Sequence, residues 1–102
     1  MAGTIWTPTA ETHLEEIVYH IAISSGRPVT AEKIAREIHD KCDLYARNPL
    51  LGEARPDLGE NYRIFSHKRW VIIYHPIEDG IVVEAVFDGS RDYPRLFHRG
   101  GS

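Results

Sequence analysis

Residues 70–87 read WVIIYHPIEDGIVVEAVF, and this stretch decides the fold. Two runs rich in β-branched and aromatic residues, 70–74 and 81–87, flank Asp79-Gly80, a pair typical of a tight hairpin turn. The first run is almost wholly apolar, as in a central strand covered on both faces. Strict alternation in the second run would place Ile81, Val83, Ala85 and Phe87 on one face, and Val82, Glu84 and Val86 on the other. The stretch therefore predicts two antiparallel strands with one fully covered face and a second face that is partly open.

The residues before this hairpin add a third strand. Residues 62–65 are short and β-prone, so we expect a three-stranded antiparallel meander. Residues 49–60 contain two prolines and two glycines and are typical of an ordered loop.

Two amphipathic helices precede the loop. The first has Thr7 as its N-cap, Pro8 in its first turn and Gly26 after its end. The second is predicted to be capped by Thr30 and to end at Asn48-Pro49. Their apolar stripes are Ala10, Leu14, Ile17, Val18, Ile21 and Ala22, and then Ala31, Ile34, Ala35, Ile38, Cys42, Tyr45 and Ala46.

Thr4–Trp6 is a short strand before the helices. The pattern predicts an α+β fold of order β-α-α-β-β-β, with a helical hairpin packed on one face of a small antiparallel sheet.

The chain of 102 residues is long enough for one hydrophobic core, so we expect a single domain over residues 1–99 and a frayed end over 100–102. Its one cysteine, Cys42, excludes an internal disulfide and is expected to be half-buried on its helix. The first residues lack the basic and apolar regions of a signal peptide, and no run approaches a membrane span, so the expected location is the cytoplasm.

The charge distribution weighs against a nucleic-acid substrate. The net charge is −3; residues 1–57 carry nine acids against six bases, and residues 58–102 carry six of each. Affinity for a phosphate backbone comes mainly from Lys and Arg. No direct nucleic-acid partner is therefore expected, although a local basic patch remains open.

Metal and cofactor chemistry have no clear motif. Glu16 and His20 are four residues apart on one helix, but no third ligand stands at a fixed spacing. The glycines follow no phosphate-loop pattern. We expect neither a metal nor a cofactor.

The order and spacing of these signals resemble the RelE/ParE superfamily of toxins over nearly the whole chain. The matching segments are Trp6-Thr7 with Leu14-Glu15-Glu16-Ile17, the loop from Asn48-Pro49 to Gly59, 62–65, 71–74, and 86–93. The last resembles the family's V-x-H-G-x-R-D ending, with Asp88 in the place of the histidine. The resemblance implies a toxin that is held inactive by a cognate antitoxin, whose flexible segment folds onto it.

Within this superfamily, RelE-like members are ribosome-dependent endoribonucleases and ParE-like members bind DNA gyrase. The nuclease candidates here are Arg63, His75, Arg91 and Tyr93. Arginine clamps phosphate but is no base at neutral pH, so His75 or Tyr93 would have to move protons. Structural alternatives also exist: Arg63 paired with Glu84 or Asp92, His75 solvated at a strand end, and Tyr93 as a lid over the sheet edge.

The loop before the meander favours the ParE branch. RelE-like nucleases tend to carry lysines there, whereas this loop has only Arg55 among Glu53, Asp57 and Glu60. We therefore expect a gyrase inhibitor without an active site, with a RelE-like nuclease and a non-toxic binding module as alternatives. The expected target- or antitoxin-binding residues are Arg63, Arg91, Asp92, Tyr93, Arg95, Leu96 and Phe97. The alternative for Leu96 and Phe97 is a C-terminal strap that packs on the open sheet face.

Overall fold

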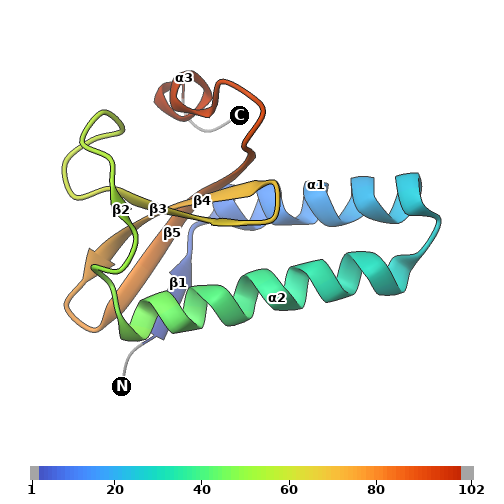
Figure 1. Ribbon diagram of the computed structural model, residues 1–102, viewed down its shortest axis with the longest axis horizontal. Coiled ribbons are helices and arrows are strands. Elements are labelled where there is room, and N and C mark those ends of the chain that lie inside the picture. Colours follow the sequence, from blue (N-terminus) through green and yellow to red (C-terminus); the bar gives the residue numbers. More distant parts are fainter. Residues whose placement is uncertain (1–2, 100–102) are drawn as a thin grey trace.

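A computed structural model describes residues 3–99 and arranges them as a helical hairpin beside a twisted sheet, with a short helix on the sheet's other face (Figure 1). The elements are β1 (Gly3–Trp6), α1 (Pro8–Ser25), α2 (Pro28–Arg47), β2 (Glu53–Ala54), β3 (Arg63–His67), β4 (Trp70–Ile77), β5 (Gly80–Asp88) and α3 (Tyr93–His98). The predicted fraying of residues 100–102 falls outside the described residues.

The α+β class and the helical hairpin are confirmed, but the sheet is mixed rather than purely antiparallel. Its order is β1-β5-β4-β3-β2, and β1 runs parallel to β5, with Gly3 opposite Gly80 and Trp6 opposite Val83. β2, which pairs with β3, adds a fifth strand inside the predicted loop.

The ends of α1 follow the sequence closely. The Thr7 side chain accepts a hydrogen bond from the Ala10 amide at 3.1 Å, and Gly26 closes the helix at φ +67°. The prediction for the start of α2 was wrong: it begins at Pro28, two residues before Thr30, and Arg27 precedes it without a side-chain cap. Proline suits the first helical position because its φ is already helical and its missing N–H needs no partner there.

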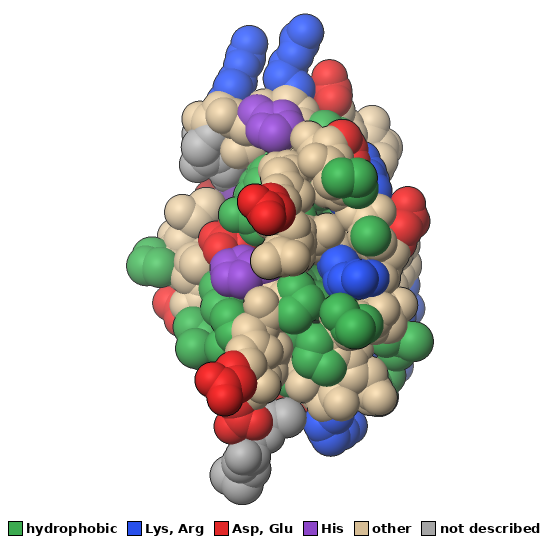
Figure 2. Space-filling view, turned by 90° about the vertical axis from the view of Figure 1, so that its left-hand side faces the viewer, with side chains coloured by type: hydrophobic (Ala, Val, Ile, Leu, Met, Phe, Trp, Pro, Cys, Tyr) green, Lys and Arg blue, Asp and Glu red, His purple; other side chains and the backbone are tan. Residues whose placement is uncertain are grey.

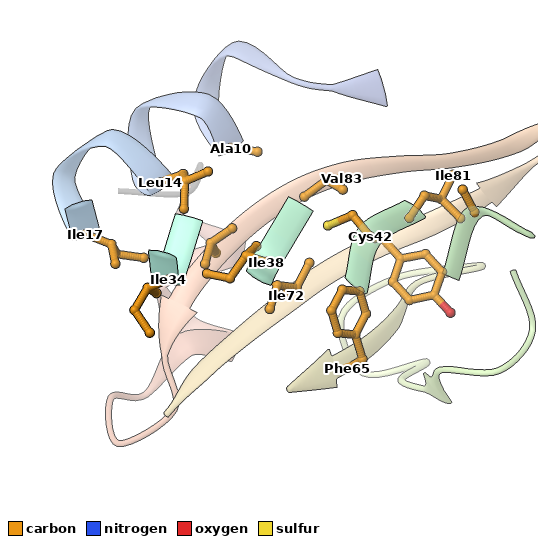
Figure 3. Packing of buried hydrophobic residues seen from close by; sticks show 13 residues of the cluster. Ala10, Leu14, Ile17, Ile34, Ile38, Cys42, Phe65, Ile72, Ile81 and Val83 are labelled. Carbon is orange, nitrogen blue, oxygen red and sulfur yellow. The ribbon is translucent and has the colours of Figure 1, made fainter. Parts of the chain in front are cut away.

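The main hydrophobic core lies between the hairpin and the sheet (Figure 3). Leu14 and Ile17 of α1 and Ile34, Ile38 and Cys42 of α2 point toward the strands. The strands contribute Phe65, Ile72, Tyr74, Ile81, Val83 and Val86 to this core. Burial is deeper than predicted for Cys42, which is fully enclosed, and burial raises its pKa to about 12.

A bulge in β5 overturns the predicted alternation of that strand. Ile73 pairs with Ala85 and Tyr74 with Val83, so Glu84 has no partner residue on β4. An unpaired residue reverses the facing of all residues beyond it. Ile81 and Val83 therefore lie in the hairpin core with Val86, whereas Ala85 and Phe87 lie on the opposite face.

That opposite face carries a second, smaller cluster. Val71, Ile73, Ala85 and Phe87 meet Leu58 and Ile64 there, and Leu96 and Phe97 of α3 cover them together with Tyr62 and Tyr93. The strap predicted for Leu96 and Phe97 is confirmed, although the helical form of residues 93–98 was not foreseen.

Candidate functional site

Arg63 is occupied by backbone carbonyls rather than by a carboxylate, contrary to the predicted pairing with Glu84 or Asp92. From β3 its Nη1 donates to Gly52 O at 2.7 Å and to Leu50 O at 3.2 Å. The 50–52 turn leaves these carbonyls outside the sheet ladder, and a forked guanidinium can bind two of them at once. Arg63 therefore fixes the loop before β2.

His75 lies within β4 and is half-buried, not solvated at a strand end as predicted. Its Nδ1 is 3.0 Å from Glu84 Oε2, without the alignment of a good hydrogen bond. The ring meets Tyr62 edge-on at 5.7 Å between centroids, and Tyr62 in turn meets Phe97. The bulge explains the pair, because it places Glu84 next to His75 on the face that α3 covers.

Tyr93 packs over the second sheet face, whereas the predicted lid lay over the sheet edge. Its ring stacks on Phe87 at 6.5 Å, and its hydroxyl accepts a hydrogen bond from Arg55 Nη1 at 2.7 Å. Arg55 also donates two hydrogen bonds of 2.8 Å to the Asp57 carboxylate. This fork, more than the Tyr93 contact, raises the pKa of Arg55 and lowers the pKa of Asp57.

Asp88, which stands where the superfamily ending has histidine, closes a turn. It accepts hydrogen bonds from the amide and hydroxyl of Ser90, both at 2.9 Å, and from Arg69. The Ser90 amide and the Arg69 guanidinium lower the pKa of Asp88 to about 2. Asp88 is therefore an anionic anchor for the chain after β5, and has no proton to exchange near neutral pH.

The four nuclease candidates do not converge within the described part of the chain. Arg63 and Tyr93 line separate hollows, and Arg91 lines a third between α1 and the end of β5. Arg91, Asp92 and Arg95 are exposed. The distance from Arg95 Nε to Asp92 Oδ2 is 3.9 Å. None of these three hollows is lined by more than one of Arg63, Arg91 and Tyr93, so none of them is a shared pocket for a phosphodiester.

An apolar groove lies on the helical hairpin. It encloses about 620 Å³ between α1 and α2 next to β1, and Trp6, Leu14, Val18, Tyr19, Ala22 and Ala35 form its apolar lining. Glu11, Glu15 and His39 complete its rim. Tyr19 is 64% exposed, and its ring meets the ring of His20 edge-on at 5.9 Å between centroids.

None of the residues that line this groove was among the predicted binding residues. Four of its apolar residues, Leu14, Val18, Ala22 and Ala35, belong to the helical stripes that the sequence assigned to the core, and Tyr19 lies beside the stripe of α1. The apolar stripe of α1 is wider than the surface that the sheet and α2 cover. Of the residues of α1, they bury only Ala10, Leu14 and Ile17.

Two further observations concern residues 3–99. No group of three His, Cys, Asp or Glu side chains is arranged to hold a metal ion there. In the same range, none of the helices combines the length and apolarity needed to cross a membrane.

Comparison with known proteins identifies the fold and the family of this chain. A solved chain from the chromosomal ParDE TA system of P. aeruginosa superposes with a TM-score of 0.72 at 19% identity, covering 86% of this chain and 96% of that one. At this identity the likeness supports the fold alone. No curated protein sequence matches. The family model for the ParE toxin of the type II toxin-antitoxin system parDE matches residues 4–93, which is most of the chain. The chain therefore belongs to the ParE toxin family of type II toxin–antitoxin systems.

Proposed function

We propose that this chain is a toxin that inhibits DNA gyrase by protein–protein contact in the cytoplasm and is neutralised by a cognate antitoxin. Family membership supports the toxin role and an antitoxin partner. The observation that carries the mode of action is the dispersal of the candidate catalytic residues: Arg63 binds carbonyls, Tyr93 binds Arg55, and Arg91 lines a different hollow from either. Such an arrangement suits binding better than phosphodiester cleavage.

The hairpin groove supports the antitoxin part of the proposal. An amphipathic segment that folds on binding needs a long apolar groove, and the groove between α1 and α2 offers one with an acidic rim. Glu11 and Glu15 would pair with basic residues flanking the segment's apolar face. The antitoxin segment is accordingly expected to be an amphipathic helix with Lys or Arg beside its aliphatic anchors.

Purified DNA gyrase tests the target. The toxin is expected to inhibit supercoiling or to trap cleaved DNA at stoichiometric concentrations, and normal supercoiling in the presence of folded toxin would remove gyrase from the proposal. Message isolated from cells expressing the toxin should stay intact. Cuts at fixed codon positions that disappear with Arg63→Ala would instead establish a nuclease, and normal growth on induction would indicate a non-toxic binding module.

The antitoxin contact is tested with the protein encoded by the neighbouring reading frame. Tyr19→Glu puts a charge into the groove and is expected to weaken that binding by more than tenfold. Ile23→Glu is the matched control, because Ile23 is 67% exposed one turn along α1 and does not line the groove. Equal loss in both variants, or no loss in either, would move the antitoxin to another surface.

A further inference from the structure

The five-stranded sheet has two edges, and they are not equally protected. β2 forms one edge with only two residues, of which Glu53 is charged. Short length and charge both hinder pairing with another chain. Side chains of every type also cover the end of the molecule where β2 lies (Figure 2). β1 forms the other edge, and its four residues, Gly3–Trp6, include neither a charged residue nor a proline. β1 is therefore the less protected edge.

The pairing of β1 with β5 uses alternate residues of β1. The Gly3 amide donates to Asp79 O at 3.0 Å, and the Thr7 amide, directly after the strand, donates to Val83 O at 3.1 Å. In a parallel pair, the residues whose backbone groups face the neighbouring strand alternate with residues whose groups face away. Ile5 is in phase with Gly3 and Thr7, so its N–H and C=O also face β5.

Thr4 and Trp6 are out of phase with this ladder, so their N–H and C=O groups point away from the sheet. Within residues 3–99 these backbone groups form no hydrogen bond. Neither residue is buried. Because an unpaired strand edge is a template for a further strand, β1 offers donors and acceptors to another extended chain.

This free edge is complementary to itself. If two copies meet antiparallel about a two-fold axis at Ile5, Thr4 of each copy lies opposite Trp6 of the other. Each such pair exchanges both of its N–H···O=C hydrogen bonds, so the two pairs satisfy all the outward backbone groups of β1. A two-fold interface needs the same self-complementary patch on both subunits, and β1 is such a patch.

The apolar side chain of Ile5 fits the same arrangement. Trp6 packs against the main core, so Ile5, its neighbour in the strand, lies on the sheet face away from the helical hairpin. Ile5 is 55% exposed there. Across the two-fold axis it lies beside Ile5 of the second copy, and this contact removes apolar surface from water in both copies.

The polar groups on the hairpin side of β1 are also complementary. The Thr4 hydroxyl donates to Asp43 Oδ1 at 3.1 Å, and the Trp6 ring packs against His39 at 4.8 Å between centroids. Because Thr4 of one copy lies opposite Trp6 of the other, Asp43 of each copy is on the side of His39 of its partner. Both side chains are exposed, so a carboxylate of one copy faces an imidazole of the other rather than a second carboxylate.

We infer that the free edge of β1 is a docking surface for a second copy of this chain, and that an antiparallel β1–β1 pair joins the two sheets into one. The interface is short, whereas stable complexes bury about 800 Å² per partner. The dimer is therefore weak and forms at high protein concentration. It also affects the hairpin groove, because Trp6 lines the groove with its side chain and faces the second copy with its backbone.

A disulfide at position 5 tests the register. The two copies of Ile5 form a non-hydrogen-bonded pair, in which Cα atoms lie about 4.5 Å apart, within the range that a disulfide spans. Under mild oxidation Ile5→Cys is expected to form a disulfide-linked dimer at least about tenfold faster than Ile23→Cys, because the pair raises the local concentration of the thiols. Ile23 is 67% exposed and is the matched control, and Cys42 is buried. Equal rates for the two variants would overturn the proposal.

Removing one outward amide tests the hydrogen bonds. The unaltered chain is expected to show a reversible monomer–dimer equilibrium in sedimentation velocity. Thr4→Pro removes an amide that the protein's own sheet does not use, and should weaken the dimer about tenfold or more. Thr4→Val is the matched control, because it also loses the bond to Asp43 but keeps the amide, and it should change the dimer by less than about twofold.

Thermal unfolding shows whether these variants are folded. If Thr4→Pro disturbs β1, Ile5→Glu replaces it, because it sets two carboxylates opposite each other across the axis. A chain that stays monomeric at every concentration, or an equal loss in Thr4→Pro and Thr4→Val, would overturn the β1–β1 pair.

Other contacts give different results. If an extended segment of the antitoxin pairs with β1 instead, the isolated chain is monomeric and Thr4→Pro loses antitoxin binding, which overturns the second copy as the occupant. A dimer that Tyr19→Glu abolishes and Thr4→Pro does not would place the contact in the hairpin groove, and would also overturn the proposal.

Discussion

Removing one hydroxyl from the core should loosen the loop before β2. Tyr74 has no exposed surface, yet its hydroxyl donates to Pro49 O at 2.7 Å and accepts from the Gly52 amide at 3.0 Å. Burial raises the pKa of this hydroxyl, so it stays protonated and can serve both partners. Tyr74→Phe removes both hydrogen bonds and leaves the buried Gly52 amide without its partner.

The expected loss can be worked from these contacts. Each hydrogen bond contributes about 1 kcal/mol net, and the unpaired buried amide adds a desolvation penalty, for a total of about 3 kcal/mol. In a domain of this size, 1 kcal/mol corresponds to about 4–8 °C, so Tm should fall by roughly 15 °C. Arg63 holds the same turn from β3, so the loop should loosen without the whole domain unfolding.

Urea denaturation measures the free energy of unfolding, and amide exchange at Gly52 measures the local effect. Tyr45→Phe is the control: Tyr45 stacks on Phe65 at 4.0 Å in the same core, but its hydroxyl has no hydrogen bond within residues 3–99, so a change below about 0.5 kcal/mol is expected. A loss below 1 kcal/mol for Tyr74→Phe, equal to that of the control, would refute the reasoning.

Three shorter predictions follow from single contacts. Asp88→Asn should destabilise by about 2 kcal/mol at pH 7, because it weakens the hydrogen bonds of a charged group. Because the pKa of Asp88 is lowered to about 2, its stabilisation is present above pH 4 and disappears toward pH 2; the two proteins should therefore converge in acid unfolding, and a constant gap would contradict this. Cys42, with its pKa raised to about 12, should resist alkylation at pH 8 until denaturant is added, and rapid native labelling would show that the site opens. Gly80→Ala should displace β1, because a Cβ there meets the Gly3 carbonyl and φ is +143°; unchanged exchange of the β1 amides would rule out this clash.

The local signals in the sequence predicted the helices and the meander well. Thr7, Gly26 and Asn48 mark helix ends by chemistry confined to a few neighbouring residues, and Asp79-Gly80 does the same for the β4–β5 turn. Such signals act within one turn of chain, so tertiary contacts rarely overrule them.

The long-range features could not be predicted in the same way. The residues Thr4–Trp6 do not themselves indicate a parallel pairing with β5. That pairing depends on the helical hairpin, which carries the chain back across the sheet. The bulge at Glu84 depends on the register with β4, and a residue-by-residue alternation cannot contain it. The assumed alternation therefore placed Ala85 and Phe87 on the wrong face of the sheet and did not predict the His75–Glu84 pair.

The candidate site shows the same contrast between local signals, which the sequence contains, and long-range contacts, which it does not. The sequence identified Arg63 and Tyr93 as notable, but their partners, the Gly52 carbonyl and the Arg55 guanidinium, come from segments up to 38 residues away. The residues that line the hairpin groove were not identified, because periodicity shows which helix face is apolar and does not show how much of that face a neighbour covers.

The parallel pairing of β1 with β5 has a consequence for how the toxin is made. Residues 3–6 are synthesised well before β5, the strand that receives them, because both helices of the hairpin and three further strands lie between the two in the chain. Contacts between such distant segments form late and slow the folding rate. The finished sheet, and with it every surface assembled on it, therefore appears only after β5 has been made, so the helical hairpin exists for an interval without the completed sheet beneath it.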